Sequence, residues 1–164
     1  MVHAGIITIS DRSSQGVRED TSGPLIADIL NNISISVCRS RIIPDEKEQI
    51  KEAIIQFADK ECLDLIITTG GTGVSPRDIT PEATLEVIDR QIPGMAEAMR
   101  HQSMQITPYA MISRAVVGIR GVSLIVNLPG SPKAAKENLE TILPALKHAI
   151  EKIKGDASEC ATVI

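Results

Sequence analysis

The sequence predicts an α/β fold with three layers: a doubly wound, mostly parallel sheet with helices on both faces. Short apolar segments of strand length alternate with amphipathic segments of helix length along the chain, and this alternation is typical of such sheets. The 164 residues are enough for one ordinary domain with a full hydrophobic core. We expect that domain over residues 1–155 and a flexible, small and polar tail over residues 156–164.

The first part of the chain predicts two strands and two helices. Residues 5–10 (GIITIS) are an apolar run typical of a buried strand, and residues 35–43 alternate as a half-exposed strand does. Between them, a helix is expected to begin near Pro24, because proline fits the first helical turn. A clearer helix follows, with its apolar side chains spaced as one stripe along one face. The stripe consists of Ile50, Ala53, Ile54, Phe57 and Ala58.

The middle of the chain predicts three further strands and two helices. Residues 63–69 form another buried strand, and residues 115–119 and 123–127 are two more strand-like segments. A helix is expected to begin at Thr80, where Pro81 and Glu82 follow, and residues 94–104 also have helical spacing.

The last predicted helix begins after residues 131–132 (SP) and carries apolar side chains in helical phase. Pro144 lies inside this pattern. Because proline has no N–H and its ring collides with the preceding turn, the sequence predicts a break or a kink there.

Unusual loops follow three of the predicted strands. They are residues 10–12 (SDR), residues 69–73 (TGGTG) and residues 127–131 (NLPGS). Parallel strands bring their carboxyl ends to one edge of the sheet, and ligands of such sheets bind just beyond that edge. We therefore expect the three loops to meet in one site.

The loop Gly70-Gly71-Thr72-Gly73 is the strongest local signal. Three glycines in four residues allow close backbone approach, and successive N–H groups in such a loop can bind an anion. The loop matches neither the P-loop nor the dinucleotide-binding glycine pattern. A phosphate cradle and a tight turn without a ligand are equally compatible with this pattern.

Asp45 and Asp78 are the two carboxylates considered as metal ligands. Asp78 lies five residues beyond the glycine loop, and a carboxylate beside bound phosphates suggests a Mg²⁺ ligand. The alternative for Asp78 is a turn before the helix at Thr80. Asp45 also follows a predicted strand, but with Glu48 three residues later it resembles a helix capping box, so a plain N-cap is its alternative.

Several cations could bind phosphate near these loops: Arg12, Arg77, Arg114 and Lys133. Each of them alone is as easily explained by a solvated or paired surface side chain.

The composition excludes several functional classes. The net charge is −4, and the chain has one Phe, one Tyr and no Trp, so neither a basic nucleic-acid surface nor a base-stacking platform is expected. No apolar run is long enough to span a membrane. The three cysteines, Cys38, Cys62 and Cys160, form no paired motif. This argues against a disulfide framework or zinc site and favours the cytoplasm.

Seven short motifs are spread over residues 4–155. They are residues 5–11 (GIITISD), 19–23 (EDTSG), 43–46 (IPDE), 68–84 (TTGGTGVSPRDITPEAT), 93–95 (PGM), 112–114 (ISR) and 127–131 (NLPGS). Together they resemble the molybdopterin adenylyltransferases. This is the MogA family, which includes the G domain of gephyrin and of the related plant fusion protein.

The resemblance implies a homotrimer that binds molybdopterin and ATP, transfers AMP to the molybdopterin phosphate and passes the product to a separate molybdenum insertase. It implies catalytic and Mg²⁺-binding roles for Asp45 and Asp78. Nucleotide or molybdopterin binding is expected from Asp11, Gly70, Gly71, Thr72, Gly73, Ser113, Arg114, Gly130 and Ser131. The alternatives are a molybdopterin carrier that does not adenylate its ligand, or a trimeric scaffold of the same fold.

Overall fold

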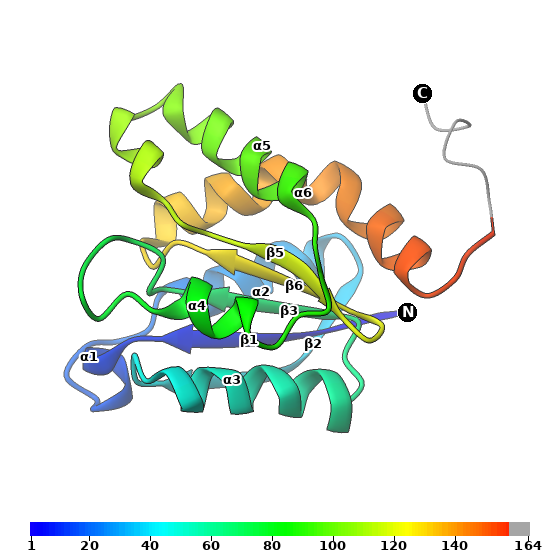
Figure 1. The fold of residues 1–164 in the computed structure, drawn as a ribbon, viewed down its shortest axis with the longest axis horizontal. Coiled ribbons are helices and arrows are strands. Elements are labelled where there is room, and N and C mark those ends of the chain that lie inside the picture. Colours follow the sequence, from blue (N-terminus) through cyan, green and yellow to red (C-terminus); the bar gives the residue numbers. More distant parts are fainter. Residues whose placement is uncertain (158–164) are drawn as a thin grey trace.

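The computed structural model describes residues 1–157 and contains a six-stranded sheet with helices on both faces (Figure 1). The strand order is β2-β1-β3-β6-β5-β4. The strands β2, β1, β3 and β6 are parallel, and β5 runs antiparallel to both of its neighbours. The mostly parallel α/β sheet predicted from the sequence is therefore confirmed. The strands are β1 (Val2–Ile9), β2 (Ile35–Ile43), β3 (Leu65–Thr69), β4 (Arg90–Gln91), β5 (Val117–Arg120) and β6 (Ser123–Leu128).

The helices divide between the two faces of the sheet. One face packs against α2, α5 and α6, and the other packs against α3, the π-helical turn η1 and α4. The helical segments are α1 (Asp11–Ser14), α2 (Ser22–Asn32), α3 (Lys47–Ile55), η1 (Gln56–Lys60), α4 (Thr80–Leu85), α5 (Pro93–Met104), the 3₁₀ helix η2 (Pro108–Ile112) and α6 (Pro132–Ile153).

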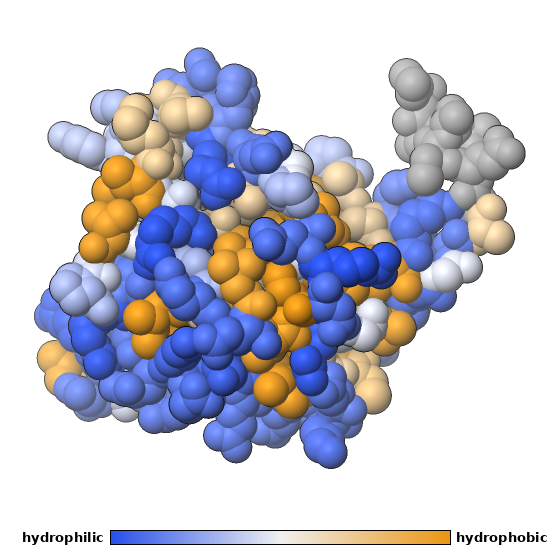
Figure 2. All heavy atoms as spheres, in the orientation of Figure 1, coloured by the Kyte–Doolittle hydropathy of each residue, from blue (hydrophilic) through white to orange (hydrophobic). Residues whose placement is uncertain are grey.

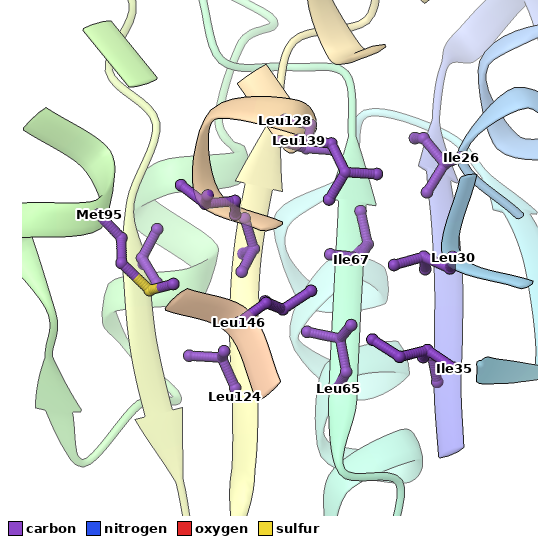
Figure 3. Packing of buried hydrophobic residues seen from close by; sticks show 14 of the residues in the cluster. Ile26, Leu30, Ile35, Leu65, Ile67, Met95, Leu124, Leu128, Leu139 and Leu146 are labelled. Atoms are coloured by element: carbon purple, nitrogen blue, oxygen red, sulfur yellow. The ribbon is translucent and has the colours of Figure 1, made fainter. Parts of the chain in front are cut away.

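The central strand β3 is buried along its whole length. Leu65 and Ile67 belong to the core beneath α2 and α6, as Figure 3 shows, whereas Ile66 between them belongs to the core of the opposite face. All three residues are fully buried. A strand covered on both faces needs apolar side chains at every position.

Helix α6 continues through Pro144, so the predicted break does not occur. Ile142 and Leu146, on either side of the proline, are both buried against the sheet. Their burial outweighs the loss of one helical hydrogen bond. The carbonyl that loses its partner belongs to Glu140, an exposed residue, where water can reach it.

Within the described residues, no helix combines the length and the apolar character needed to cross a membrane.

Asp64 connects three distant parts of the chain. One carboxylate oxygen accepts a hydrogen bond from the backbone N–H of His3 at 2.8 Å, and the other accepts one from Lys154 Nζ at 2.6 Å. Asp64 is only 5% exposed. Burial by itself would raise the pKa of Asp64, but the hydrogen bonds from Lys154 and His3 hold it below its ordinary value.

We predict that Asp64→Asn lowers the free energy of unfolding at pH 7 by about 1–2 kcal/mol, since Lys154 is half exposed and screened. A lowered folded-state pKa stabilises the fold above the unfolded value of about 3.9, and this contribution is lost as the pH falls through the folded value. The difference between variant and wild type should therefore disappear in acid.

Urea unfolding at neutral and acid pH measures both effects. Asp28→Asn, at an exposed position on α2, is the control and should match the wild type throughout. Wild-type stability of Asp64→Asn at pH 7 would contradict the prediction.

Candidate functional site

The ends of β1, β3 and β6 meet at Gly70, so the three loops expected to share one edge of the sheet do so. The Gly70 N–H donates to the carbonyl of Leu128 at 3.0 Å. A Cβ on Gly70 would lie 2.1 Å from the carbonyl oxygen of Ile9, and one on Gly130 would lie 3.2 Å from Gly70 Cα. With a φ of 108° as well, Gly70 is a position that only glycine can occupy without displacing β1.

The glycine loop presents consecutive backbone donors. The N–H groups of Gly71, Thr72 and Gly73 have no hydrogen-bond partner within residues 1–157. On the carbonyl side, the hydroxyl of Thr80 donates to the Gly70 oxygen at 2.9 Å, and the Thr80 N–H donates to the Gly71 oxygen at 3.1 Å. The first two carbonyls of the loop are thus bound by α4, while three successive donors remain available to an anion.

Two carboxylates border this loop. A Cβ on Gly71 would lie 3.2 Å from Asp45 Oδ1, and one on Gly73 would lie 2.8 Å from Asp78 Oδ2. Asp78 Oδ2 also accepts a hydrogen bond from the N–H of Ser75 at 2.8 Å. The residues expected to hold a metal ion and those expected to hold phosphate are therefore neighbours.

Asp45 is not a helix cap, so the predicted capping box with Glu48 is wrong. Helix α3 begins at Lys47 after Glu46, and no side chain caps it. The carboxylate of Asp45 instead accepts the N–H of Asp11 at 2.8 Å, while the carboxylate of Asp11 accepts the N–H of Asp45 at 3.0 Å. This reciprocal pair joins the ends of β1 and β2, a contact that local sequence cannot indicate.

The two members of this pair differ in charge environment. Burial raises the pKa of Asp45, and the negative charges of Asp11 and Asp78 add to the rise. Arg77 lowers the pKa of Asp11 by hydrogen bonding to both of its oxygens, at 3.1 and 2.9 Å. Arg77 also pairs with Glu46, so its charge is already matched by two carboxylates. Asp45 has no such direct cation partner within the described residues.

Arg114 binds the outside of the glycine loop. Its Nε donates to the Gly73 carbonyl at 2.6 Å, and its other nitrogens donate to the Asp78 carbonyl and to the carboxylate of Glu82. Its backbone N–H donates to the Thr72 carbonyl at 2.9 Å. Arg114 therefore positions the glycine loop. The sequence predicted that Arg114 would line the binding pocket itself.

Two cavities adjoin the glycine loop. Cavity A, of about 450 Å³, lies between the loop, η2, α5 and α6, and its lining includes the apolar side chains of Ala110, Ile112 and Pro129. Cavity B, of about 350 Å³, lies over the ends of β1 and β3 and the N-terminus of α2, and its lining is rich in hydroxyl and carboxylate groups. Gly71, Asp78 and Gly130 line both.

Most of the residues expected in the site line one of these cavities. Gly71, Asp78 and Gly130 lie between the two, Thr72, Gly73 and Ser113 line cavity A, and Asp45, Gly70 and Ser131 line cavity B. Asp11 and Arg114 line neither and act on the site through Asp45 and the loop. Arg77, considered as a phosphate-binding side chain, forms ion pairs with Asp11 and Glu46 instead.

Sequence reasoning assigned no role to several polar residues of the cavities. Asp20, in cavity B, accepts the Thr8 hydroxyl at 2.6 Å and the Ser22 N–H at 3.0 Å. Arg100 and Asn138, in cavity A, lie within helices α5 and α6. Only the packing of these helices brings the last two together, so their local sequence carries no signal.

We predict that Gly71→Ala lowers the free energy of unfolding by about 2–4 kcal/mol. The φ of Gly71 is 65°, and a Cβ there would lie 2.3 Å from the buried Thr80 hydroxyl. Gly94→Ala is the matched control, because a Cβ on Gly94 meets nothing within 4 Å. Urea unfolding measures both variants, and equal stabilities would contradict the left-handed loop.

Comparison with known proteins agrees with this arrangement. Residues 5–148 match the family model described as a probable molybdopterin binding domain. A molybdopterin adenylyltransferase of Helicobacter pylori strain J99 is 42% identical over 157 residues, covering 94% of this chain and 89% of the relative. Gephyrin of Dictyostelium discoideum is 46% identical over 89% of this chain, which is 22% of its own length.

Solved structures of molybdopterin biosynthesis proteins also resemble this chain. The molybdopterin biosynthesis enzyme MoaB from Thermus thermophilus superposes with a TM-score of 0.90 at 48% identity, covering 94% of this chain and 98% of that one. A MogA structure superposes with a TM-score of 0.87 at 40% identity, covering 92% and 99%. With the glycine loop, the flanking carboxylates and the sheet all in place, this chain belongs to the molybdopterin-binding family that includes MogA and the related domain of gephyrin.

Proposed function

We propose that this protein transfers AMP from ATP to the phosphate of molybdopterin, in the biosynthesis of the molybdenum cofactor. The observation that carries the proposal is the pair of adjoining cavities with Gly71, Asp78 and Gly130 between them. A transfer between two bound molecules requires that their reacting groups meet, and these shared residues are where the occupants of the two cavities would meet.

The reaction joins two phosphates. An oxygen of the molybdopterin phosphate attacks the α-phosphorus of ATP, the new P–O bond forms, and the bond to the β-phosphate oxygen breaks to release pyrophosphate. Because the attacking oxygen is already anionic, no general base is needed. The protein has to align the phosphates and stabilise their charge. The unpaired N–H groups of Gly71, Thr72 and Gly73 supply fixed donors for that charge.

We assign ATP to cavity B and the pterin of molybdopterin to cavity A. Cavity B lies over the carboxyl ends of the strands, where α/β sheets bind nucleotides. Cavity A offers apolar walls with a few polar side chains, which suits a flat heterocycle.

Asp45 and Asp78 fit a magnesium ion that enters with ATP. Their carboxylates both border the glycine loop, and Mg²⁺ in nucleotide sites is usually held by one or two carboxylates together with substrate phosphates. When bound there, Mg²⁺ would neutralise charge on the phosphates and on the departing pyrophosphate. Burial and neighbouring charges already raise the pKa of Asp45, so a cation beside it would be favoured.

A carrier or a scaffold of the same fold is the less favoured alternative. Neither of them requires two half-buried carboxylates beside loop N–H groups that have no partner among the described residues. Measuring pyrophosphate release from ATP with molybdopterin and Mg²⁺ tests the proposal directly. Binding of molybdopterin without any release would support the carrier.

We further propose a cytoplasmic enzyme whose adenylylated product is consumed by a separate molybdenum insertase. Cys38 and Cys62 are exposed free thiols, which suits a reducing compartment.

We predict that Asp45→Asn lowers AMP transfer by roughly 100-fold or more, because the amide is neutral and a poor Mg²⁺ ligand. The free energy of unfolding should stay within about 0.5 kcal/mol of wild type, since the amide oxygen can still accept the Asp11 N–H. Pyrophosphate release and urea unfolding measure the two quantities.

Asp45→Ala serves as the comparison. It should lose activity equally and also about 1 kcal/mol of stability, because the Asp11 N–H loses its acceptor. Near-normal turnover of Asp45→Asn would leave Asp45 with a structural role and transfer the catalytic role to Asp78.

We also predict that the protein is a homotrimer. Exposed apolar side chains around η2, including Ile106, Met111 and Ile112, contribute to an apolar surface (Figure 2) of the kind that self-association covers. Light scattering at micromolar concentration should give three times the chain mass of 17.6 kDa. A monomeric mass would contradict this prediction without affecting the proposed reaction.

A further inference from the structure

Three of the polar side chains that line cavity A keep hydrogen-bonding groups without a partner among the described residues. Arg100 comes from α5, and Glu137 and Asn138 come from α6. None of the three has a role in the transfer of AMP as derived above.

Asn138 is a fixed acceptor. Its Nδ2 donates to the hydroxyl of Ser103 at 3.0 Å and to the carbonyl of Ala134 at 2.8 Å. The residue is only 7% exposed, so these two bonds set the orientation of its amide. The Oδ1 atom has no partner in the described part of the chain and is left as an acceptor on the cavity side.

Arg100 and Glu137 add a donor and a second acceptor. Arg100 Nη1 donates to the carbonyl of Ala115 at 2.9 Å, which anchors the guanidinium and leaves its other N–H groups without a partner among residues 1–157. Among residues 1–157, the one ion-pair partner of the Glu137 carboxylate is Lys133, whose Nζ lies 3.9 Å from Oε1. Arg100 and Glu137 form no ion pair with each other in the described residues, so both remain available to a ligand.

We propose that Arg100, Glu137 and Asn138 recognise the edge of a 2-amino-4-oxo-pyrimidine ring, and so admit a pterin to cavity A and reject adenine. This edge presents a carbonyl oxygen, a ring N–H and an amino group in a row. A carboxylate accepts two parallel N–H bonds, and a guanidinium donates to a carbonyl.

Adenine presents the opposite pattern at its corresponding edge. Its amino group would face Arg100, and its ring nitrogen, an acceptor, would face the carboxylate of Glu137. Buried polar groups left unpaired in this way are what allow a binding site to discriminate strongly. The inference rests on the proposed function, because it explains how two flat heterocycles are sorted between adjoining cavities. Guanine has the same edge as a pterin, so guanine derivatives are expected to compete for cavity A.

Three simple pteridines test the proposal without ATP or molybdopterin: pterin, lumazine and 2,4-diaminopteridine. Lumazine carries oxygen in place of the 2-amino group, and the diamino compound carries an amino group in place of the 4-oxo group. In fluorescence titrations, the wild type should bind pterin at least tenfold more tightly than either analogue.

Two variants separate the roles. Glu137→Gln should lose the preference for pterin over lumazine, because an amide can donate to the lumazine oxygen. Arg100→Gln should lose the preference for pterin over 2,4-diaminopteridine. Glu140→Gln, at an exposed position on the same helix, is the control and should keep both preferences. Unchanged thermal unfolding of each variant shows that its fold is intact.

The outcomes separate this inference from the proposed function. If folded Glu137→Gln keeps the wild-type preference for pterin over lumazine, or if the wild type shows no saturable pterin binding, the inference is wrong while AMP transfer remains possible. Absence of pyrophosphate release by the wild type would contradict the proposed function alone, because ring selection is measured without ATP.

Discussion

The close approach of three strand ends at Gly70 is the constraint on which the rest of the site depends. A side chain at that position would collide with the carbonyl of Ile9, and Gly130, in the loop that follows β6, packs against the Gly70 Cα. The absence of side chains lets β1, β3 and β6 end at the same depth. The glycine loop then leaves the sheet with its carbonyls bound by α4 and Arg114, and the N–H groups of residues 71–73 have no partner within the described residues.

Around the glycine loop, some carboxylates are matched by a cation in an ion pair and others are unmatched within the described part of the chain. Asp11 is matched by Arg77, and Glu82 is matched by Arg114, whose remaining donors bind loop carbonyls. The carboxylate of Asp45 accepts a hydrogen bond from the backbone N–H of Asp11 and has no cation partner among the described residues. The matched groups fix the geometry, and the unmatched carboxylate retains an attraction for a cation. A site organised in this way reorganises little when its ligands bind, which favours catalysis by alignment.

The sheet and the meeting of its loops could be predicted because they follow from local pattern and from one general rule. Buried runs such as residues 65–69 identify strands, and parallel strands bring their ends together. The sequence left a helix cap open as the alternative for Asp45, because a capping box and a contact to Asp11 place the same carboxylate after the same strand. Arg100 and Asn138 depend on the packing of α5 on α6. The two-residue strand β4 is too short to have a pattern of its own.

Tyr109 lines cavity A and is 79% exposed at its rim. It is the one tyrosine of a chain that contains no tryptophan, so the near-ultraviolet signal of the folded protein originates almost entirely at this rim. The chain therefore carries an intrinsic optical probe beside the cavity assigned to the pterin. Occupancy of that cavity can be followed by tyrosine fluorescence without attaching a dye, and the absence of tryptophan leaves the emission of a bound pteridine unobscured.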